Sequence, residues 1–395
     1  MEHGVVTRDS AYSSAAPHGA IEQRVASRIS SEANEEARQF RATSSEPFSL
    51  PYPNGWFALC PSSKLKPGQL LNVPFMGEEL LVYRTQSGQV HVTEPYCPHL
   101  GAHLGHGGKV DGENLVCPFH GLSFGPDGVC AGAPYGRKPP RAKLNHWLVC
   151  ERGGAVLVWR HNKGCSPDWE LPDIDTAGFS AARESCFQLN GQPHNSPENA
   201  ADSTHFMWLH HLTHVEMSHE VKGRTMKIQV MGFSSRWRAR IRMTIYGMGF
   251  VCADSELPAL GVLLRSCSFG TPKTPSTWTY TVVDRVHVKG FARLPPLLRR
   301  LLYALVVTLM HRWTVRVLRD DFAIWAHRRY IKQPKLMEGE APIAAFRRWM
   351  TQFYPEDGDR VSTWTREAPG SSSEGTQRGN PSPGTRMTAQ FAPPW

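Results

Sequence analysis

Residues 97–120 read CPHLGAHLGHGGKVDGENLVCPFH and contain two Cys/His pairs, C-P-H at 97–99 and C-P-F-H at 117–120. Two thiolates and two imidazoles can bind one tetrahedral zinc ion, or they can hold a [2Fe–2S] cluster with histidines on one of its irons. Zinc ligands are usually separated by about two to four residues, whereas a single residue separates Cys97 from His99. Side chains at that spacing diverge, so the first pair favours the cluster over zinc.

The composition predicts a globular protein of two domains. The chain has 395 residues, of which 40% are hydrophobic, including 12 Trp and 17 Phe, so it can bury a sizeable core. The formal net charge of +9 is compatible with an acidic redox partner, a membrane surface or simple solubility. The sequence contains no nucleic-acid-binding module, and we expect no nucleic-acid partner.

Cysteine usage indicates a reducing compartment. The nine cysteines are an odd number and no secretory signal opens the sequence, which argues against a disulfide framework and predicts a cytoplasmic protein. Only Cys97 and Cys117 have a histidine within three residues. We interpret the other seven as small buried apolar residues.

Four segments follow from composition and periodicity. Residues 1–45 are rich in Ser, Ala, Glu and Arg and are predicted to be a disordered leader. Residues 46–165 contain short β-rich runs between Gly and Pro turns, which predicts a small antiparallel β domain with the Cys/His pairs on adjoining loops. Residues 180–365 form a second, larger domain, and the Ser-, Gly-, Pro- and Thr-rich residues 366–395 a disordered tail.

The glycines that follow the two pairs, Gly101 and Gly121, suggest a further feature of the loops. Their missing Cβ atoms could let backbone N–H groups approach the sulfurs of a cluster.

In the second domain, residues 237–245 alternate cleanly between apolar and polar side chains, and Trp278, Tyr280 and Val282 repeat the alternation. This is typical of half-buried antiparallel strands, so we expect a sheet covered by helices and an α+β protein overall.

Residues 294–330 are predicted to be helical. Their apolar run, 301–310, is ten residues long and lies between Arg299–Arg300 and His311–Arg312. A membrane span needs about 20 apolar residues. We therefore predict no transmembrane span, but a buried or interfacial helix with a possible peripheral membrane contact.

A second candidate metal site lies at residues 198–214, ENAADSTHFMWLHHLTH. A non-haem Fe(II) centre needs two histidines and one carboxylate on one face of the metal. His210 and His214 are four residues apart and could chelate from a regular helix. His205 and His210 lie roughly 140° apart around an ideal helix, so they require a helix that is distorted or that ends. Spacing by itself favours His210 and His214.

Both metal motifs resemble those of the Rieske non-haem iron oxygenases. The loops C-P-H-L-G-A-H-L-G and C-P-F-H-G-L-S-F-G resemble the cluster loops of this family, and residues 199–210 match its N-x2-D-x2-H-x4-H signature. The resemblance implies a small all-β Rieske [2Fe–2S] domain followed by a helix-grip (START-like) antiparallel-sheet catalytic domain. It implies cluster ligation by Cys97, His99, Cys117 and His120.

The same resemblance reverses the choice of histidines. It implies that His205 and His210 bind a mononuclear Fe(II). Asp202 would connect that iron, through hydrogen bonds, to the cluster of a neighbouring subunit in a head-to-tail homotrimer.

The third iron ligand is predicted from residues 319–325, RDDFAIW, which resemble the D-x2-I/V-W pattern of the steroid-acting branch. Asp321 matches the ligand position of that pattern, and Asp320 is a rival that the sequence does not exclude. Without the resemblance, Asp321 would be interpreted as a helical carboxylate paired with Arg319 or Arg328. Residues 325–334 and 340–354 also resemble the 3-ketosteroid 9α-hydroxylase and cholesterol 7-desaturase group.

These resemblances imply the oxygenase component of a monooxygenase. It would use O2, and electrons from NAD(P)H passed on by a separate flavin/iron–sulfur reductase, to hydroxylate an apolar polycyclic substrate such as a steroid or sterol. A desaturase or an O-demethylase would use the same metals. We expect a large apolar pocket, with Phe206, Met207 and Trp208 as lining or core residues.

Two other classes of protein compete with an oxygenase. A steroid-binding module would leave the triad without iron. A respiratory Rieske electron carrier has an extra cysteine in each loop, whereas this chain has Ala102 and Phe119 at those positions. The respiratory carrier also has hydroxyl groups near the cluster, where this chain has Leu122 and Phe124.

We predict a reduction potential of about −150 to 0 mV for the cluster, because fewer hydrogen bonds to sulfur stabilise the reduced state less. A redox titration of the purified protein measures this directly. A potential above about +200 mV would instead indicate an electron carrier of the respiratory type.

Overall fold

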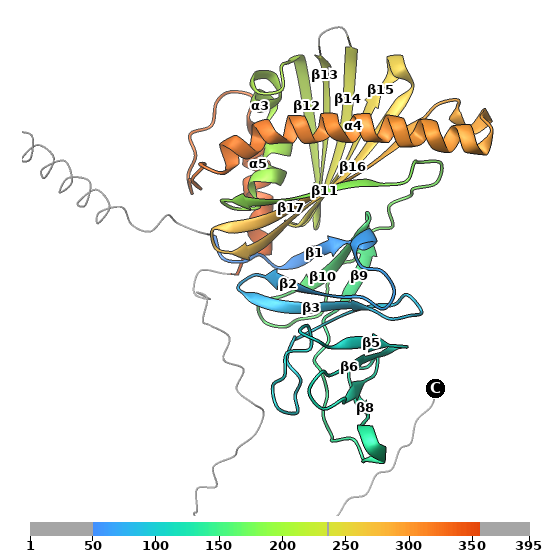
Figure 1. Cartoon of the computed structure of the whole chain (residues 1–395). Coiled ribbons are helices and arrows are strands. Elements are labelled where there is room, and N and C mark those ends of the chain that lie inside the picture. Colours follow the sequence, from blue (N-terminus) through green and yellow to red (C-terminus); the bar gives the residue numbers. More distant parts are fainter. Residues whose placement is uncertain (1–49, 235–236, 356–395) are drawn as a thin grey trace, which may run out of the picture. The chain divides into compact units, whose positions relative to one another are not determined.

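The first part of the chain forms three small antiparallel sheets, as its short apolar runs predict (Figure 1). The computed structural model describes residues 50–234 and 237–355, so the predicted disordered leader and tail lie outside the described residues. One sheet contains β1 (Gly55–Pro61), β10 (Ala155–Arg160) and β9 (Val149–Arg152). The second contains β2 (Leu70–Phe75), β3 (Glu78–Arg84) and β4 (Val90–Thr93). The third contains β5 (Lys109–Asp111), β6 (Asn114–Val116), β7 (Ser123–Phe124) and β8 (Cys130–Gly132).

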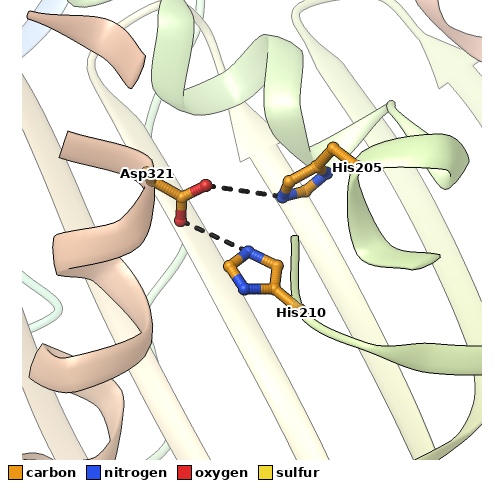
Figure 2. A group of neighbouring side chains, drawn as sticks. All are labelled: His205, His210 and Asp321. Carbon is orange, nitrogen blue, oxygen red and sulfur yellow. Dashed lines mark ion pairs between the residues drawn. The ribbon is translucent and has the colours of Figure 1, made fainter. Parts of the chain in front are cut away.

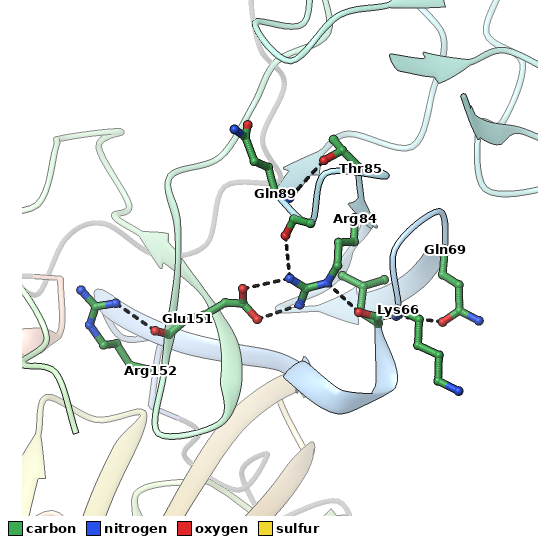
Figure 3. Close-up of polar contacts among 9 residues, drawn as sticks. Lys66, Gln69, Arg84, Thr85, Gln89, Glu151 and Arg152 are labelled. Atoms are coloured by element: carbon green, nitrogen blue, oxygen red, sulfur yellow. Dashed lines mark hydrogen bonds and ion pairs between the residues drawn. The ribbon is translucent and has the colours of Figure 1, made fainter. Parts of the chain in front are cut away.

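An arginine fork joins the first two of these sheets (Figure 3). Arg84, on β3, donates to both carboxylate oxygens of Glu151, on β9, over 2.7 and 3.0 Å, and to the carbonyl oxygen of Leu65 over 2.6 Å. The hydrogen bonds from Arg84 lower the pKa of Glu151. Bidentate arginine–carboxylate pairs fix orientation as well as distance, so this pair links β3 and β9 in a defined geometry.

The second region contains a seven-stranded antiparallel sheet with the strand order β11-β17-β16-β15-β14-β13-β12. Its strands are β11 (Arg183–Asn190), β12 (Leu212–Lys222), β13 (Thr225–Ser234), β14 (Trp237–Tyr246), β15 (Phe250–Leu257), β16 (Val262–Thr274) and β17 (Thr277–Val288). The alternation predicted for β14 is confirmed, because Met243 and Ile245 are buried while Arg240 and Arg242 are exposed and pair with Glu256.

The first two small sheets and the large sheet share one hydrophobic core, whereas the third small sheet packs on a core of its own. A single cluster of buried side chains includes Phe57 and Val158 from the first region and Ile228 and Ile245 from the second. Thr271, on β16, donates to the carbonyl oxygen of Ala58 over 2.7 Å. The second region therefore supports the first by packing as well as by covalent connection.

Four α-helices complete the described part of the chain: α2 (Asn195–Ala200), α3 (Ser203–Trp208), α4 (Pro296–Trp325) and α5 (Ala341–Met350). Single 3-10 turns occur at η1 (Ser62–Lys64), η2 (Pro134–Gly136), η3 (Pro258–Leu260), η4 (Phe291–Arg293) and η5 (Thr351–Phe353). The long helix α4 runs across the large sheet (Figure 1), and its Phe322 and Trp325 pack against Trp278 and Tyr280 of β17. The α+β architecture of small β domain and helix-covered sheet is confirmed.

Helix α4 differs from the sequence-based expectation in its exposure. It is 30 residues long and, by length and composition, apolar enough to cross a membrane, yet only 11% of its most apolar 18-residue window is buried. Of the two alternatives that the sequence left open, a buried or an interfacial helix, the exposed outer face excludes the fully buried one. The apolar run of ten residues was counted between Arg299–Arg300 and His311–Arg312, whereas the helix as a whole is apolar on average.

A buried ion cluster fixes α2, which precedes the histidine-rich stretch. Glu198 is 1% exposed and pairs with Arg328, in the segment after α4, and with Arg347, on α5. The guanidinium of Arg347 also lies 4.4 Å from the centre of the Tyr330 ring. A buried carboxylate is stable only when its charge is compensated, so the cluster holds three chain segments together.

Candidate metal centres

Three side chains from two distant parts of the sequence converge in front of the strands of the large sheet (Figure 2). His205 lies on α3, His210 follows that helix, and Asp321 lies near the end of α4. The Nε2 atoms of His205 and His210 are 3.6 and 3.4 Å from the two carboxylate oxygens of Asp321. One ligand atom from each residue lies within 4.8 Å of the others. The carboxylate is 5% exposed, so the three groups form a largely enclosed site.

The end of helix α3 explains how His205 and His210 face the same point. The helix ends at Trp208, and the N–H of His210 donates to the carbonyl oxygen of His205 over 3.4 Å, which carries the chain out of the helical path. The two imidazole rings are consequently 4.8 Å apart. His214 lies on β12 and is exposed, so the structure does not bring the alternative pair, His210 and His214, to the site.

Asp202 and Asn199 orient the ligand side chains. Asp202 is the N-cap of α3, and its Oδ1 accepts the backbone N–H of His205 over 2.9 Å. The Nδ1 atom of His205 donates to the carbonyl oxygen of Asp202 over 2.9 Å, which leaves Nε2 as the atom directed at Asp321. Asn199 Nδ2 donates to Asp321 Oδ1 over 3.0 Å.

The electrostatics of the site also suit metal binding. Burial lowers the pKa of His205, against the opposing effect of Asp321, and this favours the neutral imidazole that coordinates metals. Asp321 is buried whereas Asp320 is exposed, so the structure directs Asp321 and not its rival towards the histidines. Two imidazoles and one carboxylate are the donor set of a facial-triad Fe(II) centre, and the residues present fit that ion.

The two Cys/His loops have the same backbone hydrogen-bond pattern. In the first loop, the N–H of Cys97 donates to the carbonyl oxygen of Ala102, and the N–H of Gly101 donates to that of Cys97. In the second loop, Cys117 donates to Leu122 and Gly121 to Cys117 in the same way, and all four distances lie between 2.8 and 3.1 Å. Both cysteines are buried, and the rings of His99 and His120 lie 4.9 Å apart towards the surface. This division, with paired thiols inside and paired imidazoles outside, fits a [2Fe–2S] cluster that has two cysteines on one iron and two histidines on the other.

The two loop glycines also shape the turns that carry the cysteines. Gly101 and Gly121 have φ angles of 74° and 66°, and their N–H groups donate to cysteine carbonyl oxygens rather than remaining free for sulfur. Glycine is favoured there because the turn requires a left-handed backbone. The N–H groups that lower the pKa of Cys97, against the larger effect of burial, belong to His99 and Leu100.

Several secondary expectations need correction. Cys165 and Cys186 are exposed, so not all of the other seven cysteines are buried. Trp208 is 84% exposed and therefore belongs to the surface, whereas Phe206 packs beside His205. A cavity of about 220 Å³ is lined by residues that do not include the triad: Asn54, Trp159, His161, Cys165, Ser166, Asp168, Trp169, Arg224, Gln352 and Phe353.

The ion cluster around Glu198 was not predicted from the sequence. The one sequence feature that could have drawn attention to Glu198 is its position directly before Asn199 of the signature. Its arginine partners are 130 and 149 residues further along the chain, at separations where sequence patterns carry no pairing information.

Two family models match the chain. Residues 55–147 match the Rieske [2Fe-2S] domain, and residues 158–354 match the 3-Ketosteroid 9alpha-hydroxylase C-terminal domain. The first match covers both Cys/His loops, and the second covers His205, His210 and Asp321.

Similar proteins come from animals and bacteria. The chain is 31% identical to the cholesterol 7-desaturase of Drosophila melanogaster over 80% of this chain and 78% of that protein. It is 30% identical to the cholesterol 7-desaturase of Caenorhabditis elegans, with 78% of each chain covered. It is 25% identical to the oxygenase component of 3-ketosteroid-9-alpha-monooxygenase of Mycolicibacterium smegmatis, over 78% of this chain and 84% of the relative.

Solved structures share the fold. Dicamba monooxygenase bound to 3,6-dichlorosalicylic acid has a TM-score of 0.61 at 16% identity, covering 76% of this chain and 97% of that chain. Together, the triad, the paired loops and the relatives identify this chain as a member of the Rieske non-haem iron oxygenase family, in the group that contains cholesterol 7-desaturases and 3-ketosteroid 9α-monooxygenase.

Proposed function

We propose that the protein is the oxygenase component of a Rieske monooxygenase that hydroxylates a steroid or sterol. The observation that carries the proposal is the triad of His205, His210 and Asp321, enclosed beside the apolar ring of Phe206. The substrate class is inferred from the relatives, whose names refer to cholesterol and 3-ketosteroids.

In this proposal His205, His210 and Asp321 hold a mononuclear Fe(II), and the iron when bound supplies activation of O2. Asn199 holds the carboxylate of Asp321 in one orientation. Asp202 fixes the imidazole of His205 through its backbone carbonyl and caps α3 through its side chain. Cys97, His99, Cys117 and His120 hold the [2Fe–2S] cluster, which receives electrons from NAD(P)H through a flavin/iron–sulfur reductase.

We also propose the head-to-tail homotrimer and the bridging role of Asp202. Two exposed apolar surfaces support this assembly. Leu100 and Phe119 are exposed on the cluster loops, and Met207 and Trp208 are exposed next to the triad. In a head-to-tail contact, one surface of each subunit meets the other surface of its neighbour, which would cover both.

Location and domain division complete the proposal. All nine cysteines are unpaired, which supports a reducing compartment and a cytoplasmic location. We propose residues 46–165 as the Rieske domain and residues 180–365 as the catalytic domain.

Desaturation is the second candidate reaction, and a specific observation favours it. The relatives at 30% identity or more are named cholesterol 7-desaturases, whereas the monooxygenase component is 25% identical. The two outcomes need the same metal residues and differ in which C–H bond the substrate presents.

The function is tested by incubating the purified holoprotein with NADH, a surrogate reductase and a panel containing cholesterol and 3-ketosteroids. We expect a product that has gained one oxygen atom, measured by mass spectrometry. A product that has lost two hydrogens would identify a desaturase. If no panel member is converted although the cluster is reduced, the steroid assignment is wrong.

Asp321→Ala should remove the mononuclear iron and spare the cluster, because the site would lose its only carboxylate. Iron content should fall from about three to about two atoms per chain, while the visible absorption of the cluster is retained. Asp320→Ala is the matched control, since its side chain is exposed on the same helix, and it should keep all the iron. Equal loss in both variants would refute ligation by Asp321.

Asp202→Asn should bind both metals and slow turnover by at least about tenfold, a barrier increase of about 1.4 kcal/mol. Asparagine can still cap α3, so this change removes the carboxylate and keeps the cap. Asp202→Ala removes both functions and serves for comparison. Normal turnover with the Asn variant and slow turnover with the Ala variant would reduce Asp202 to a helix cap.

A further inference from the structure

The outer face of α4 is apolar over four helical turns. Five large apolar side chains follow one another at intervals of four residues and are between 50% and 72% exposed: Leu297, Leu301, Leu305, Leu309 and Trp313. Leu298, next to the first of them, is 45% exposed. Residues four apart are neighbours on a helix surface but lie about 40° apart around its axis. These six side chains, here called the α4 stripe, therefore form one continuous row about 24 Å long that winds about 160° around the exposed side of α4.

A helix that covers a sheet in a water-soluble protein normally has a polar outer face. The inner face of α4 is already occupied, since Val307 and Phe322 are buried against the sheet. The apolar character of the α4 stripe therefore serves no packing within the described residues, and a surface of this size indicates a partner.

The charge around the α4 stripe indicates what kind of partner it is. From Lys289 to Arg319 the chain has 31 residues with seven basic side chains and no Asp or Glu. Arg312 lies next to Trp313, Arg316 and Arg319 follow it, and all three are exposed. Their spacings of four and three residues place them on the same side of α4 as the leucines. The surface is thus mainly apolar in its first half, where Arg299 and Arg300 also lie, and cationic in its second half.

We propose that the α4 stripe binds the surface of an anionic lipid bilayer, with its leucines and Trp313 in the interface and its arginines on the lipid headgroups. Helices that lie in a membrane interface combine these two features, and Trp is favoured at that depth. This inference goes beyond the proposed function and does not depend on the substrate.

The contacts of α4 require it to lie on the membrane rather than cross it. His311 contacts Asp284 and Ser185 at 2.8 Å each, on the side opposite the stripe. Asp321 of the triad lies on the same helix, four residues before its end. Insertion across a bilayer would take these groups away from the sheet and into hydrocarbon, where charged and polar groups are costly.

Other occupants of the stripe fit less well. A second copy would bring two sets of arginines together, and like charges oppose that pairing. Residues 1–45 and 366–395 have no sustained apolar periodicity with which to cover six large side chains. A bilayer containing anionic lipid complements both halves of the surface.

The test is flotation of the full-length holoprotein with vesicles of phosphatidylcholine alone or with about 30% phosphatidylglycerol, without substrate or reductase. We expect binding to the anionic vesicles that high salt releases. In Leu305→Glu/Leu309→Glu the bound fraction should fall at least about tenfold. Leu336→Glu is the matched control, because Leu336 is 39% exposed in the loop after α4, and it should bind like the wild type.

Retention of the visible cluster absorption shows that each variant is folded. The proposal is wrong if the wild type stays with the unbound fraction at every lipid composition, or if the double variant floats like the wild type. It is also wrong if the double substitution changes the oligomeric state measured by light scattering, since the stripe would then be a subunit interface. Because no turnover is measured, failure of the steroid assignment would leave these outcomes unchanged.

Discussion

The approach of Asp321 to His205 and His210 is the constraint on which the architecture of the second region depends. The carboxylate and the imidazoles come from segments more than 100 residues apart, yet their atoms must meet within a few ångströms. The sheet positions Asp321 relative to the histidines, because α4 crosses the sheet and packs Phe322 and Trp325 against β17. The pairing of Glu198 with Arg328 and Arg347 then fixes α2 against the chain that leaves α4. Each contact reduces the freedom of a ligand before any metal binds, which is how a protein selects a metal geometry.

The cluster site is built differently, from local turns. Both loops close on themselves through the same pair of backbone hydrogen bonds, and each needs one glycine in a left-handed conformation. The loops pack on a core of their own, which contains Cys97, Cys117 and Phe124 and is separate from the core that the first two sheets share with the large sheet. The ligands of this site are contained within 24 residues.

Helix α4 has two faces with separate physical demands. Its inner face buries Val307, Phe322 and Trp325 and holds Asp321, while its outer face carries exposed leucines. A helix apolar on both sides has little amphipathic periodicity, and the burial of each side chain then depends on what lies next to it. The same helix thus contributes a metal ligand on one side and the proposed membrane surface on the other.

The sequence by itself predicted the Cys/His loops as the candidate cluster site, the strand-rich first part, the alternating strands of the second part and the family, because these signals are local in the chain. The family signature also pointed to His205 and His210. Ideal helical spacing favoured His210 and His214 instead, because the end of α3 at Trp208 cannot be inferred from periodicity. The resemblance favoured Asp321, but the sequence left Asp320 open, and only the tertiary structure shows that Asp321 is buried beside the histidines while Asp320 is exposed. Adjacent helical residues point about 100° apart, and the packing of α4 on β17 decides which of them faces inward. The partners of Glu198 and the exposure of the α4 stripe were likewise decided by packing between distant segments, to which the pattern of a single segment is insensitive.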